Sequence, residues 1–301
     1  MKNIFFFLGK GGVGKTTLSA SLAYYLSKHN KKTYWASIDP AHNICDVIGC
    51  PAFLGAKEIE RDLLAEEVDV ERYLKQFLKE TTAQMKRVYS YFQIINLDDM
   101  FEVIKNAPGM EESAMMHALK DIISRHRDMD HLIIDTPPTG LMLKIFTLPF
   151  ITNIWLERIK MWRHKILDKR ATIVAIRGKD YLGKGIVTDA SKDKVLNEIS
   201  VQKAAVDFLI KIFTDTQRSC FILVLNPDRL SLMEGMHIKK ALSAMNIHIG
   251  LILVNKFGLT PLASTEEFYD MPMKKVPFLK VLDKERLYQL ADSWAEDIIK
   301  D

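Results

Sequence analysis

The feature that most constrains this chain is a glycine-rich segment close to its start. Residues 9–17 read Gly-Lys-Gly-Gly-Val-Gly-Lys-Thr-Thr and match the pattern G-x-x-x-x-G-K-[ST]. The apolar run 4–8 precedes this segment, and Leu18, Leu22 and Leu26 follow it at the spacing of a helix. A strand that turns through glycines into a helix is the setting that a phosphate-binding loop requires. The sequence therefore predicts a P-loop here rather than a chance glycine turn.

The composition of the loop suits a nucleotide bound with Mg²⁺. Its glycines let successive backbone N–H groups point at phosphate oxygens, and the start of the following helix adds positive potential. Lys15 is predicted to neutralise the β and γ phosphates, and Thr16 to place its hydroxyl on the metal ion. We therefore expect ATP and Mg²⁺ as cofactors, with the nucleotide held by Gly11, Gly12, Val13, Gly14, Lys15, Thr16 and Thr17.

Further along the chain, short apolar runs alternate with longer helical patterns. Residues 33–38, 132–134, 221–225 and 251–254 form such runs, each followed by a polar or glycine-containing turn. This alternation predicts an α/β fold with a doubly wound, mostly parallel sheet of P-loop topology, covered by helices on both faces. Ligands of such sheets bind at the carboxyl ends of the strands, where the motifs described below also fall.

Two stretches interrupt this alternation. At about residues 63–127 and 151–213 the pattern is mostly helical and rich in Met, Trp and charge, without a clear strand. We expect residues 1–301 to form a single P-loop domain in which these two insertions pack together as a helical subdomain beside the sheet. Within the second insertion, residues 168–193 combine glycines with many Lys and Asp residues, which favours a mobile loop.

Composition excludes several classes of protein. The net charge of +4, from 42 basic and 38 acidic side chains, is too small to indicate a nucleic-acid ligand. No apolar run approaches the roughly 20 residues that cross a bilayer, and the first residues lack a signal-peptide cleavage site. Cys45, Cys50 and Cys220 form neither an even set nor a Cys-x-x-Cys pair, so a disulfide framework is not expected. A cytoplasmic protein without a transmembrane segment is the simplest interpretation.

Lys10 is a second basic residue inside the loop. Its side chain cannot easily reach phosphates held by its own loop, but it could serve a neighbouring active site as an arginine finger does, which can be worth about 10³ to 10⁵ in rate. The loop resembles the deviant Walker A motif of a group of ATPases. That group includes nitrogenase iron protein, the division-site and partition ATPases, and the arsenite-pump and tail-anchored-protein targeting ATPases. The resemblance implies a homodimer in which Lys10 completes the catalytic site of the partner.

Asp39 follows the second apolar run. A carboxylate there can orient an attacking water and accept its proton, although Asp39 could equally N-cap a helix begun by Pro40. Residues 39–43 read Asp-Pro-Ala-His-Asn and resemble switch I of the arsenite-pump and tail-anchored-protein targeting family. In that family this Asp is the catalytic carboxylate. His42 alone does not indicate a metal site, because no second ligand is apparent.

Asp135 ends the apolar run 132–134, which is the Walker B arrangement for holding Mg²⁺, usually through water. Residues 135–140 read Asp-Thr-Pro-Pro-Thr-Gly and are close to the Asp-Thr-Ala-Pro-Thr-Gly switch II of the same family. Two prolines could also serve only to stiffen a loop. The neighbouring acid and strand favour the switch, so we expect Thr16 and Asp135 to form the metal site.

Weaker resemblances extend over most of the chain. Residues 108–112 are similar to the family's Pro-Gly-Ile-Asp-Glu element near the dimer interface, and residues 230–234 to its Leu-Ser-Leu-Tyr-Glu segment. Asn255 ends a late strand where the family uses an Asn amide to bind adenine, a base that matches both the donor and the acceptor of an amide. Pro277 lies where a loop of the family closes over the base. These two assignments depend on the resemblance.

The resemblance leaves the ligand of the helical subdomain open. Arsenite-pump ATPases bind the metalloid through cysteine thiolates, one of them beside the Pro-Gly element, where this chain has none. Many targeting ATPases carry a zinc-binding Cys-x-x-Cys, which is absent here, but their Met-rich client groove has candidate counterparts. These are Met85, Met100, Met110, Met115 and Met116 in the first insertion, and Ile151, Trp155, Ile159, Trp162 and Ile166 in the second.

The five apolar residues of the second insertion, from Ile151 to Ile166, admit three interpretations. Their helical spacing is most often that of a core face, which is the interpretation favoured by the sequence. The same helix carries basic residues that would suit a membrane-surface helix, namely Arg158, Lys160, Arg163, Lys165, Lys169 and Arg170. The third interpretation is a groove for a hydrophobic client helix. We predict an ATP-hydrolysing homodimer in which nucleotide-driven closure rearranges such a groove, with an arsenite-pump subunit or a membrane-positioning ATPase as alternatives.

Overall fold

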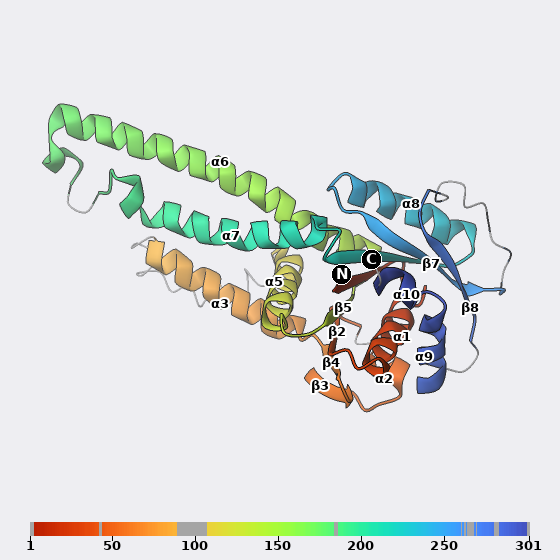
Figure 1. Ribbon diagram of the computed structural model, residues 1–301. Helices are drawn as coiled ribbons and strands as arrows, with labels where there is room; N and C mark the ends of the chain where they lie inside the picture. The colour runs from red at the N-terminus through yellow and green to blue at the C-terminus, as the bar shows by residue number, and fades with distance from the viewer. Residues whose placement is uncertain are drawn as a thin grey trace.

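The computed structural model describes residues 3–41, 44–88, 107–183, 186–259, 261, 263, 268, 270–279 and 283–299. These residues form an eight-stranded sheet in the order β3-β4-β2-β5-β1-β6-β7-β8. Its strands are β1 (Ile4–Leu8), β2 (Thr33–Ser37), β3 (Gly55–Glu60), β4 (Leu63–Glu67), β5 (His131–Asp135), β6 (Ser219–Leu225), β7 (Ile249–Phe257) and β8 (Met273–Pro277). Neighbouring strands are parallel except β3 and β4. The predicted α/β fold with a mostly parallel sheet is confirmed (Figure 1).

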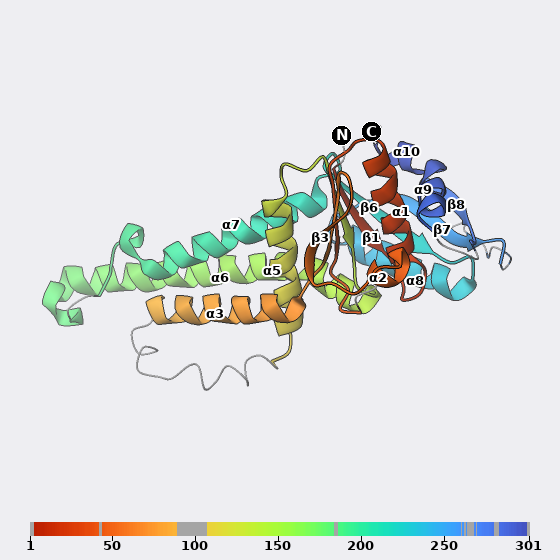
Figure 2. The same cartoon turned by 90° about the horizontal axis from the view of Figure 1, so that it is seen from below.

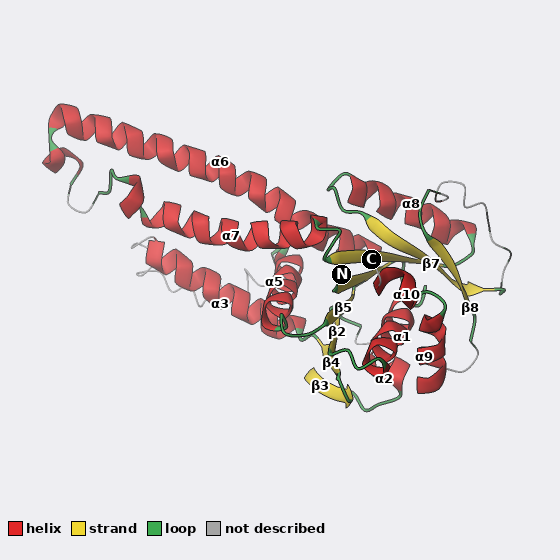
Figure 3. Cartoon of the chain, in the orientation of Figure 1, coloured by secondary structure: helices red, strands yellow, loops and turns green. Residues whose placement is uncertain are grey.

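Helices lie on both faces of the sheet and extend beyond it, as Figure 3 shows in red. Those in the described ranges are α1 (Lys15–Lys28), α2 (Ile44–Ile48), α3 (Val70–Val88), α5 (Met110–Arg125), α6 (Thr139–Arg177), α7 (Lys194–Thr214), α8 (Arg229–Ser243), α9 (Lys284–Asp292) and α10 (Ala295–Ile299).

Strand β1 illustrates why both faces are covered. Successive side chains of a strand point to opposite faces of the sheet. Phe6 packs in one hydrophobic cluster with residues of α5, α6 and α8. Phe5 and Phe7 pack in the other cluster, with α1, α9 and α10. The fully apolar sequence of β1 is therefore explained by burial on both sides, as in other doubly wound folds.

The helices α3, α6 and α7 project together away from the sheet and form the helical subdomain (Figures 1 and 2). Helices α6 and α7 pack along each other through Leu156, Leu167 and Ile199. Where they meet, the Arg163 guanidinium lies 2.7 Å from the Asp193 carboxylate, which also accepts a hydrogen bond from the Leu196 amide at the start of α7. One buried ion pair thus joins the two longest described helices.

Helix α6 starts and ends outside the bounds expected from the sequence. It begins at Thr139 rather than near residue 151, and it continues to Arg177 through residues that were predicted to form a mobile loop. Gly178, with φ 88°, ends it. The charged residues after Asp168 are compatible with a helix because most of them lie on its solvated side, so the first backbone break is this glycine. Short 3-10 turns follow at Lys179–Leu182 and Ala190–Lys192.

Helix α6 also has the length and composition of a membrane-crossing helix. It contains an 18-residue window of mean hydropathy 1.3, and 33% of that window is buried. No other helix in the described part of the chain passes this test. The core helix of a soluble protein passes it as well, and Met142, Ile145 and Phe146 of α6 do lie in a core cluster against the sheet.

Strand β4 was not expected, because residues 63–67 fall in a stretch that was predicted to be helical. Their sequence, Leu-Leu-Ala-Glu-Glu, lacks β-branched residues and consists of good helix formers. Tertiary contacts override that preference. Leu63 and Ala65 are buried on the α1 face of the sheet. Glu66 and Glu67 are also buried, and a buried carboxylate requires partners.

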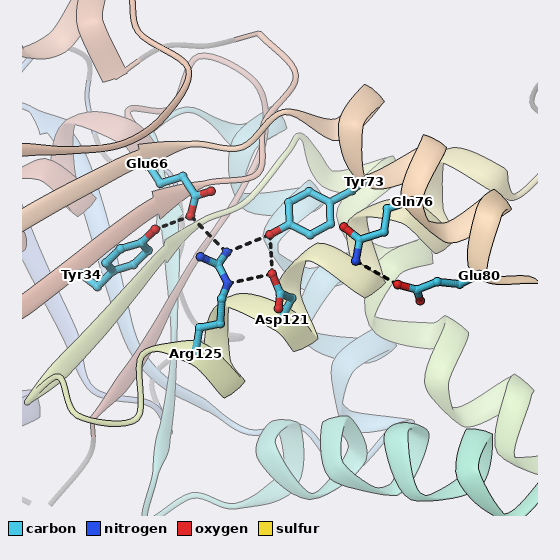
Figure 4. Close-up of polar contacts among 7 residues, drawn as sticks. All are labelled: Tyr34, Glu66, Tyr73, Gln76, Glu80, Asp121 and Arg125. Atoms are coloured by element: carbon cyan, nitrogen blue, oxygen red, sulfur yellow. Dashed lines mark hydrogen bonds and ion pairs between the residues drawn. The ribbon is translucent and has the colours of Figure 1, made fainter.

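Those partners join the sheet to the helical subdomain (Figure 4). The Tyr34 hydroxyl of β2 donates to Glu66, and the Arg125 guanidinium of α5 lies 3.8 Å from the same carboxylate. Arg125 also donates to Asp121 at 2.8 Å and to the Tyr73 hydroxyl of α3 at 2.9 Å. The Tyr73 hydroxyl in turn donates to Asp121 at 2.7 Å. One arginine therefore holds β4, α3 and α5 together.

Candidate nucleotide site

The P-loop lies between β1 and α1, as the sequence predicts, and its glycines are required by its shape. Gly14 caps α1 in the left-handed region, with φ 96°. A Cβ at Gly14 would lie 2.3 Å from Asn255 Nδ2, and one at Gly9 would lie 2.3 Å from the Val224 carbonyl oxygen. Cβ atoms at Gly11 and Gly12 would meet no atom within 4 Å. The loop is thus packed tightly on one side and open on the other, the form of a cradle for phosphates.

Lys15 is held at the centre of this cradle. Its side chain is 6% exposed and its Nζ donates to the Lys10 carbonyl oxygen at 3.3 Å. Burial lowers the pKa of Lys15, and the nearby carboxylates of Asp135, Asp39 and Glu234 act in the opposite direction. An arriving phosphate would add negative charge at this point and would favour the charged ammonium further.

Thr16 and Asp135 come together as predicted for a metal site. The Thr16 hydroxyl donates to Asp135 Oδ2 at 2.6 Å, and the Ser37 hydroxyl lies 3.4 Å from the same oxygen. Asp135 is fully buried, and its Oδ1 has no hydrogen-bond partner among the described residues. Burial raises the pKa of Asp135 to about 7. A buried carboxylate with a free oxygen beside a hydroxyl suits Mg²⁺, which takes oxygen ligands and usually keeps several waters.

Asp39 lies at the end of β2, next to β5, and is 8% exposed. Its Oδ1 accepts a hydrogen bond from the Ala41 amide at 3.1 Å, which forms a local turn over Pro40. The alternative role as a helix cap is taken by another residue. Helix α2 begins at Ile44, and Glu67 Oε1 accepts from the amides of Ile44 at 2.9 Å and Cys45 at 3.3 Å. His42 and Asn43 lie outside the described residues.

Lys10 forms an ion pair within its own chain. Its Nζ lies 3.6 Å from Glu234 Oε2 on α8, and both side chains are partly exposed. Glu234 belongs to the segment 230–234 that resembles the family, but no pattern in the sequence pairs it with Lys10. The position leaves the ammonium at the surface of the P-loop.

Two side chains at the end of β7 support the back of the loop. Asn255 Nδ2 donates to the Val13 carbonyl oxygen at 2.8 Å, and Lys256 Nζ donates to the Gly12 carbonyl oxygen at 2.7 Å. Asn255 thus lies at the site, with its amide donor engaged by the protein. The contact of Lys256 was missed in the sequence, where a lysine near the end of a strand carries no signal. Pro277 ends the neighbouring strand β8, paired with Phe257.

Comparisons with known proteins agree with this geometry. The sequence profile of the family described as "Anion-transporting ATPase" matches residues 1–293. The chain belongs to that family. Among its relatives, arsenical pump-driving ATPase 2 of Aquifex aeolicus is 27% identical, with 84% of this chain and 79% of the relative covered. ATPase get3 of Aspergillus terreus is 26% identical, with 94% of this chain and 88% of the relative covered. The ATPase ASNA1 homolog of Entamoeba histolytica is 28% identical, with 82% of this chain and 74% of the relative covered.

The ATPase presents an apolar stripe along α6 that the sequence had favoured as a core face. That interpretation is wrong for the single chain. Five side chains at helical spacing are exposed: Ile151 47%, Trp155 58%, Ile159 39%, Trp162 55% and Ile166 43%. Leu156 and Leu167, on the face turned to α7, are the buried residues of this segment. We call the five exposed residues the α6 stripe.

The methionines of the first insertion have a different role. Met115 is fully buried and Met110 and Met116 pack against the same core cluster. The side chains of Met85 and Met100 lie outside the described residues. In the ATPase the candidate binding face is therefore better defined by the tryptophans and isoleucines of α6 than by methionines.

A cavity of about 380 Å³ lies among α3, α5, α6 and α7. Its lining includes Phe77, Met116, Leu148, Val201 and Leu209, one or more from each of the four helices. Thr152, one residue after Ile151 of the stripe, also lines it. The ATPase thus has an apolar hollow that adjoins the beginning of the α6 stripe.

Proposed function

We propose that the ATPase is a homodimeric, nucleotide-operated switch whose helical subdomain binds an apolar helix of a client protein. The observation that carries this proposal is the α6 stripe. Monomeric soluble proteins seldom expose large contiguous apolar patches, and those that do use them mainly for binding. Tryptophans are also enriched among the side chains that dominate binding energy at interfaces. The name of one relative, ATPase get3, does not by itself identify a client.

The short connection from Asp135 to α6 supports a coupling between nucleotide and client. Only Thr136, Pro137 and Pro138 separate the last residue of β5 from the first residue of α6. The Thr136 hydroxyl donates to the Phe7 carbonyl oxygen at 2.6 Å, and both prolines have a restricted φ. A movement of Asp135 would therefore also move the first turn of α6, because the three residues between them have little conformational freedom.

The chemistry assigned to the site is hydrolysis of the terminal phosphate of ATP. Thr16 and Asp135 would hold Mg²⁺, which neutralises charge on the phosphates. Lys15 and the amides of the loop bind the β and γ phosphates, and Asp39 orients the attacking water and accepts its proton. Asn255 binds adenine and Pro277 lies against the base. Lys10 leaves Glu234 and enters the site of the partner when two chains meet.

The role of Lys10 is tested by Lys10→Ala. We expect ATPase activity to fall at least about 1,000-fold, the lower end for a charge supplied in trans, while ATP binding measured by calorimetry is retained. Mixing Lys10→Ala with a Lys15→Ala chain should restore part of the activity, since each mixed dimer keeps one complete site. Full activity of Lys10→Ala, or no recovery on mixing, would refute the sandwich dimer.

Client binding is tested by a fluorescent apolar helical peptide in anisotropy titrations with ATP and with ADP. The double variant Trp155→Ser/Trp162→Ser should bind at least about tenfold more weakly, which corresponds to roughly 1.4 kcal/mol. The matched control is Leu54→Ser, because Leu54 is 66% exposed but lies outside the helical subdomain. Equal loss in both variants, or no capture of several such peptides, would count against a client groove.

The basic residues beside the stripe favour a second candidate, binding of an anionic membrane surface. Arg158, Lys165 and Lys169 are exposed on α6 together with Trp155 and Trp162. Sedimentation with phosphatidylserine vesicles separates the two functions, because membrane binding falls with salt whereas capture of an apolar peptide does not.

Names of relatives also suggest a metalloid-pump ATPase, and stimulation by arsenite or antimonite in the same ATPase assay would support that alternative.

A further inference from the structure

Cys45 and Cys50 form a close pair of thiols that the spacing in the sequence does not reveal. The amides of Gly49 and Cys50 both donate to the Cys45 carbonyl oxygen, at 2.9 and 3.2 Å. Gly49 adopts φ 67°, in the left-handed region that ends α2. The resulting turn folds Cys50 back onto the helix, and the two Sγ atoms lie 3.4 Å apart.

The two thiols differ in their access to solvent. Cys45 is 7% exposed and Cys50 is half-buried at the surface of the turn. Both sulfurs lie 3.3 to 3.4 Å from the Pro51 carbonyl oxygen. Burial raises the pKa of Cys45 to about 11, so its thiolate is scarce at neutral pH. Cys50 is thus the thiol that a reagent in solution reaches first.

We propose that Cys45 and Cys50 are a redox modification site that closes to an intramolecular disulfide by exchange with a low-molecular-weight disulfide such as glutathione disulfide. The Cys50 thiolate attacks one sulfur of the oxidant and releases one glutathione thiolate. The Cys45 thiol then loses its proton and attacks the Cys50 sulfur of the mixed disulfide, which releases the second. Two cysteines are oxidised and glutathione disulfide is reduced to two molecules of glutathione, so protons and electrons balance.

Closure requires only a small movement. The sulfurs must approach from 3.4 Å to a bond of about 2.05 Å, and the turn at Gly49 already holds them on the same side. Cys220, the remaining cysteine, is only 1% exposed on β6, so a dissolved oxidant has little access to it. Glutathione disulfide should therefore oxidise Cys45 and Cys50 and leave Cys220 reduced.

The disulfide would act on the switch that carries Asp39. Cys45 lies in the first turn of α2, six residues after Asp39, and its amide is held by the Glu67 carboxylate. Helix α2 also packs on α1, which begins at the P-loop. A bond between Cys45 and Cys50 fixes α2 to its following turn, which limits how Asp39, six residues before Cys45, can adjust when a γ-phosphate binds. We expect the oxidised chain to hydrolyse ATP more slowly. This inference does not depend on the identity of the client.

The chemistry is tested by mass spectrometry, without reference to ATPase activity. The protein is equilibrated in glutathione buffers of increasing oxidised fraction, quenched with acid, denatured and alkylated. The wild-type chain should lose two hydrogens and keep one alkylatable thiol. Cys45→Ser should instead retain one glutathionyl group on Cys50, and Cys50→Ser should form no disulfide. The control Cys220→Ala should close its disulfide as the wild-type chain does. Three free thiols in the wild-type chain at every ratio would overturn the proposal.

The consequence is tested on the same samples by their ATPase rates. The oxidised wild-type chain should be slower by about tenfold or more, because misplacing a positioning group by 1 Å can cost about 100-fold, and dithiothreitol should restore the rate. Cys50→Ser should be insensitive to glutathione disulfide. A fully formed disulfide with an unchanged rate would overturn the effect on the switch. A chain without any ATPase activity would contradict the proposed switch function but leave the mass measurement intact.

Discussion

The Lys10 ammonium lies 3.6 Å from the Glu234 carboxylate of the same chain. A lysine that serves a partner site must first leave this ion pair. The free energy of the ion pair is therefore a cost of closing the dimer. Both side chains are partly exposed, and exposed pairs contribute about 0.2 to 1 kcal/mol. The cost of releasing Lys10 is therefore small compared with the catalytic contribution of about 10³ to 10⁵ in rate that the proposed role in the partner site would give its charge.

Glu234→Gln should favour the closed dimer. A symmetric dimer breaks two such pairs of up to about 1 kcal/mol each, so we predict that the protein concentration for half-maximal ATPase activity falls by up to about 30-fold. Activity measured over a dilution series checks this. In analytical ultracentrifugation with ATP, Glu234→Gln should tighten the dimer of the wild-type chain but not that of Lys10→Ala, since no lysine is left to release. A higher concentration requirement for Glu234→Gln would show that Glu234 supports the dimer rather than restrains it.

Asp39→Asn should separate catalysis from binding. The amide cannot accept a proton from water, so turnover should fall by about 10² to 10⁴ while ATP affinity changes little. Single-turnover hydrolysis and calorimetry measure the two quantities. Asp46→Asn is the matched control, because Asp46 lies nearby in α2 and is exposed. Comparable activity of the two variants would exclude Asp39 as the general base.

His131 should make the fold sensitive to acid. It is 2% exposed in β5, and burial lowers its pKa to about 4 from an ordinary value near 6.5. The unfolded chain then binds a proton between about pH 6.5 and pH 4 that the folded chain does not. The free energy of unfolding should therefore fall as the pH falls through this window, by about 3 kcal/mol in total, and level off below it.

Urea unfolding at a series of pH values measures this effect. In His131→Gln the dependence on pH between 6.5 and 4 should be weaker by up to one proton, whatever the absolute stability of the variant. Equal slopes in the wild-type chain and His131→Gln would contradict the shifted pKa.

Arg125→Met should loosen the junction between the sheet and the helical subdomain (Figure 4). The change removes the cation that faces buried Glu66 and breaks hydrogen bonds to Asp121 and Tyr73. We predict a loss of about 1 to 3 kcal/mol in the free energy of unfolding, measured by urea titration. Gln76→Ala removes an exposed hydrogen bond to Glu80 in the same view and should change stability by less than about 0.5 kcal/mol. A loss of similar size in both would assign no special role to Arg125.

The parts of the site that were predictable are those encoded in contiguous residues. The P-loop needs its glycines, Lys15 and Thr16 in one order, and Asp135 must end an apolar strand. Both follow from local geometry, and the structure places them together. Lys256 and Glu67 were not predictable, because each reaches the site from a distant strand. Even the position of Lys256 beside Asn255 does not indicate a contact with the P-loop.

The fold was likewise predictable only where contiguous residues determine the local structure. Residues 63–67 have the composition of a helix, and only tertiary contacts explain why they form β4, namely the burial of Leu63 and Ala65 and the partners of Glu66 and Glu67. The α6 stripe has the spacing of a core face, and a sequence cannot tell a buried stripe from an exposed one. Cys45 and Cys50 are five residues apart, and the turn at Gly49 that brings their sulfurs together depends on one left-handed backbone angle.

The 39 residues of α6 span roughly 58 Å at 1.5 Å per residue, and the helix begins four residues after Asp135. In the proposed switch it would act as a lever arm with its pivot near Asp135. A tilt of about 5° at the pivot carries the far end through about 5 Å, close to the rise of one helical turn. Sub-ångström adjustments around a phosphate can in this way become displacements as large as a side chain at the tip of the molecule.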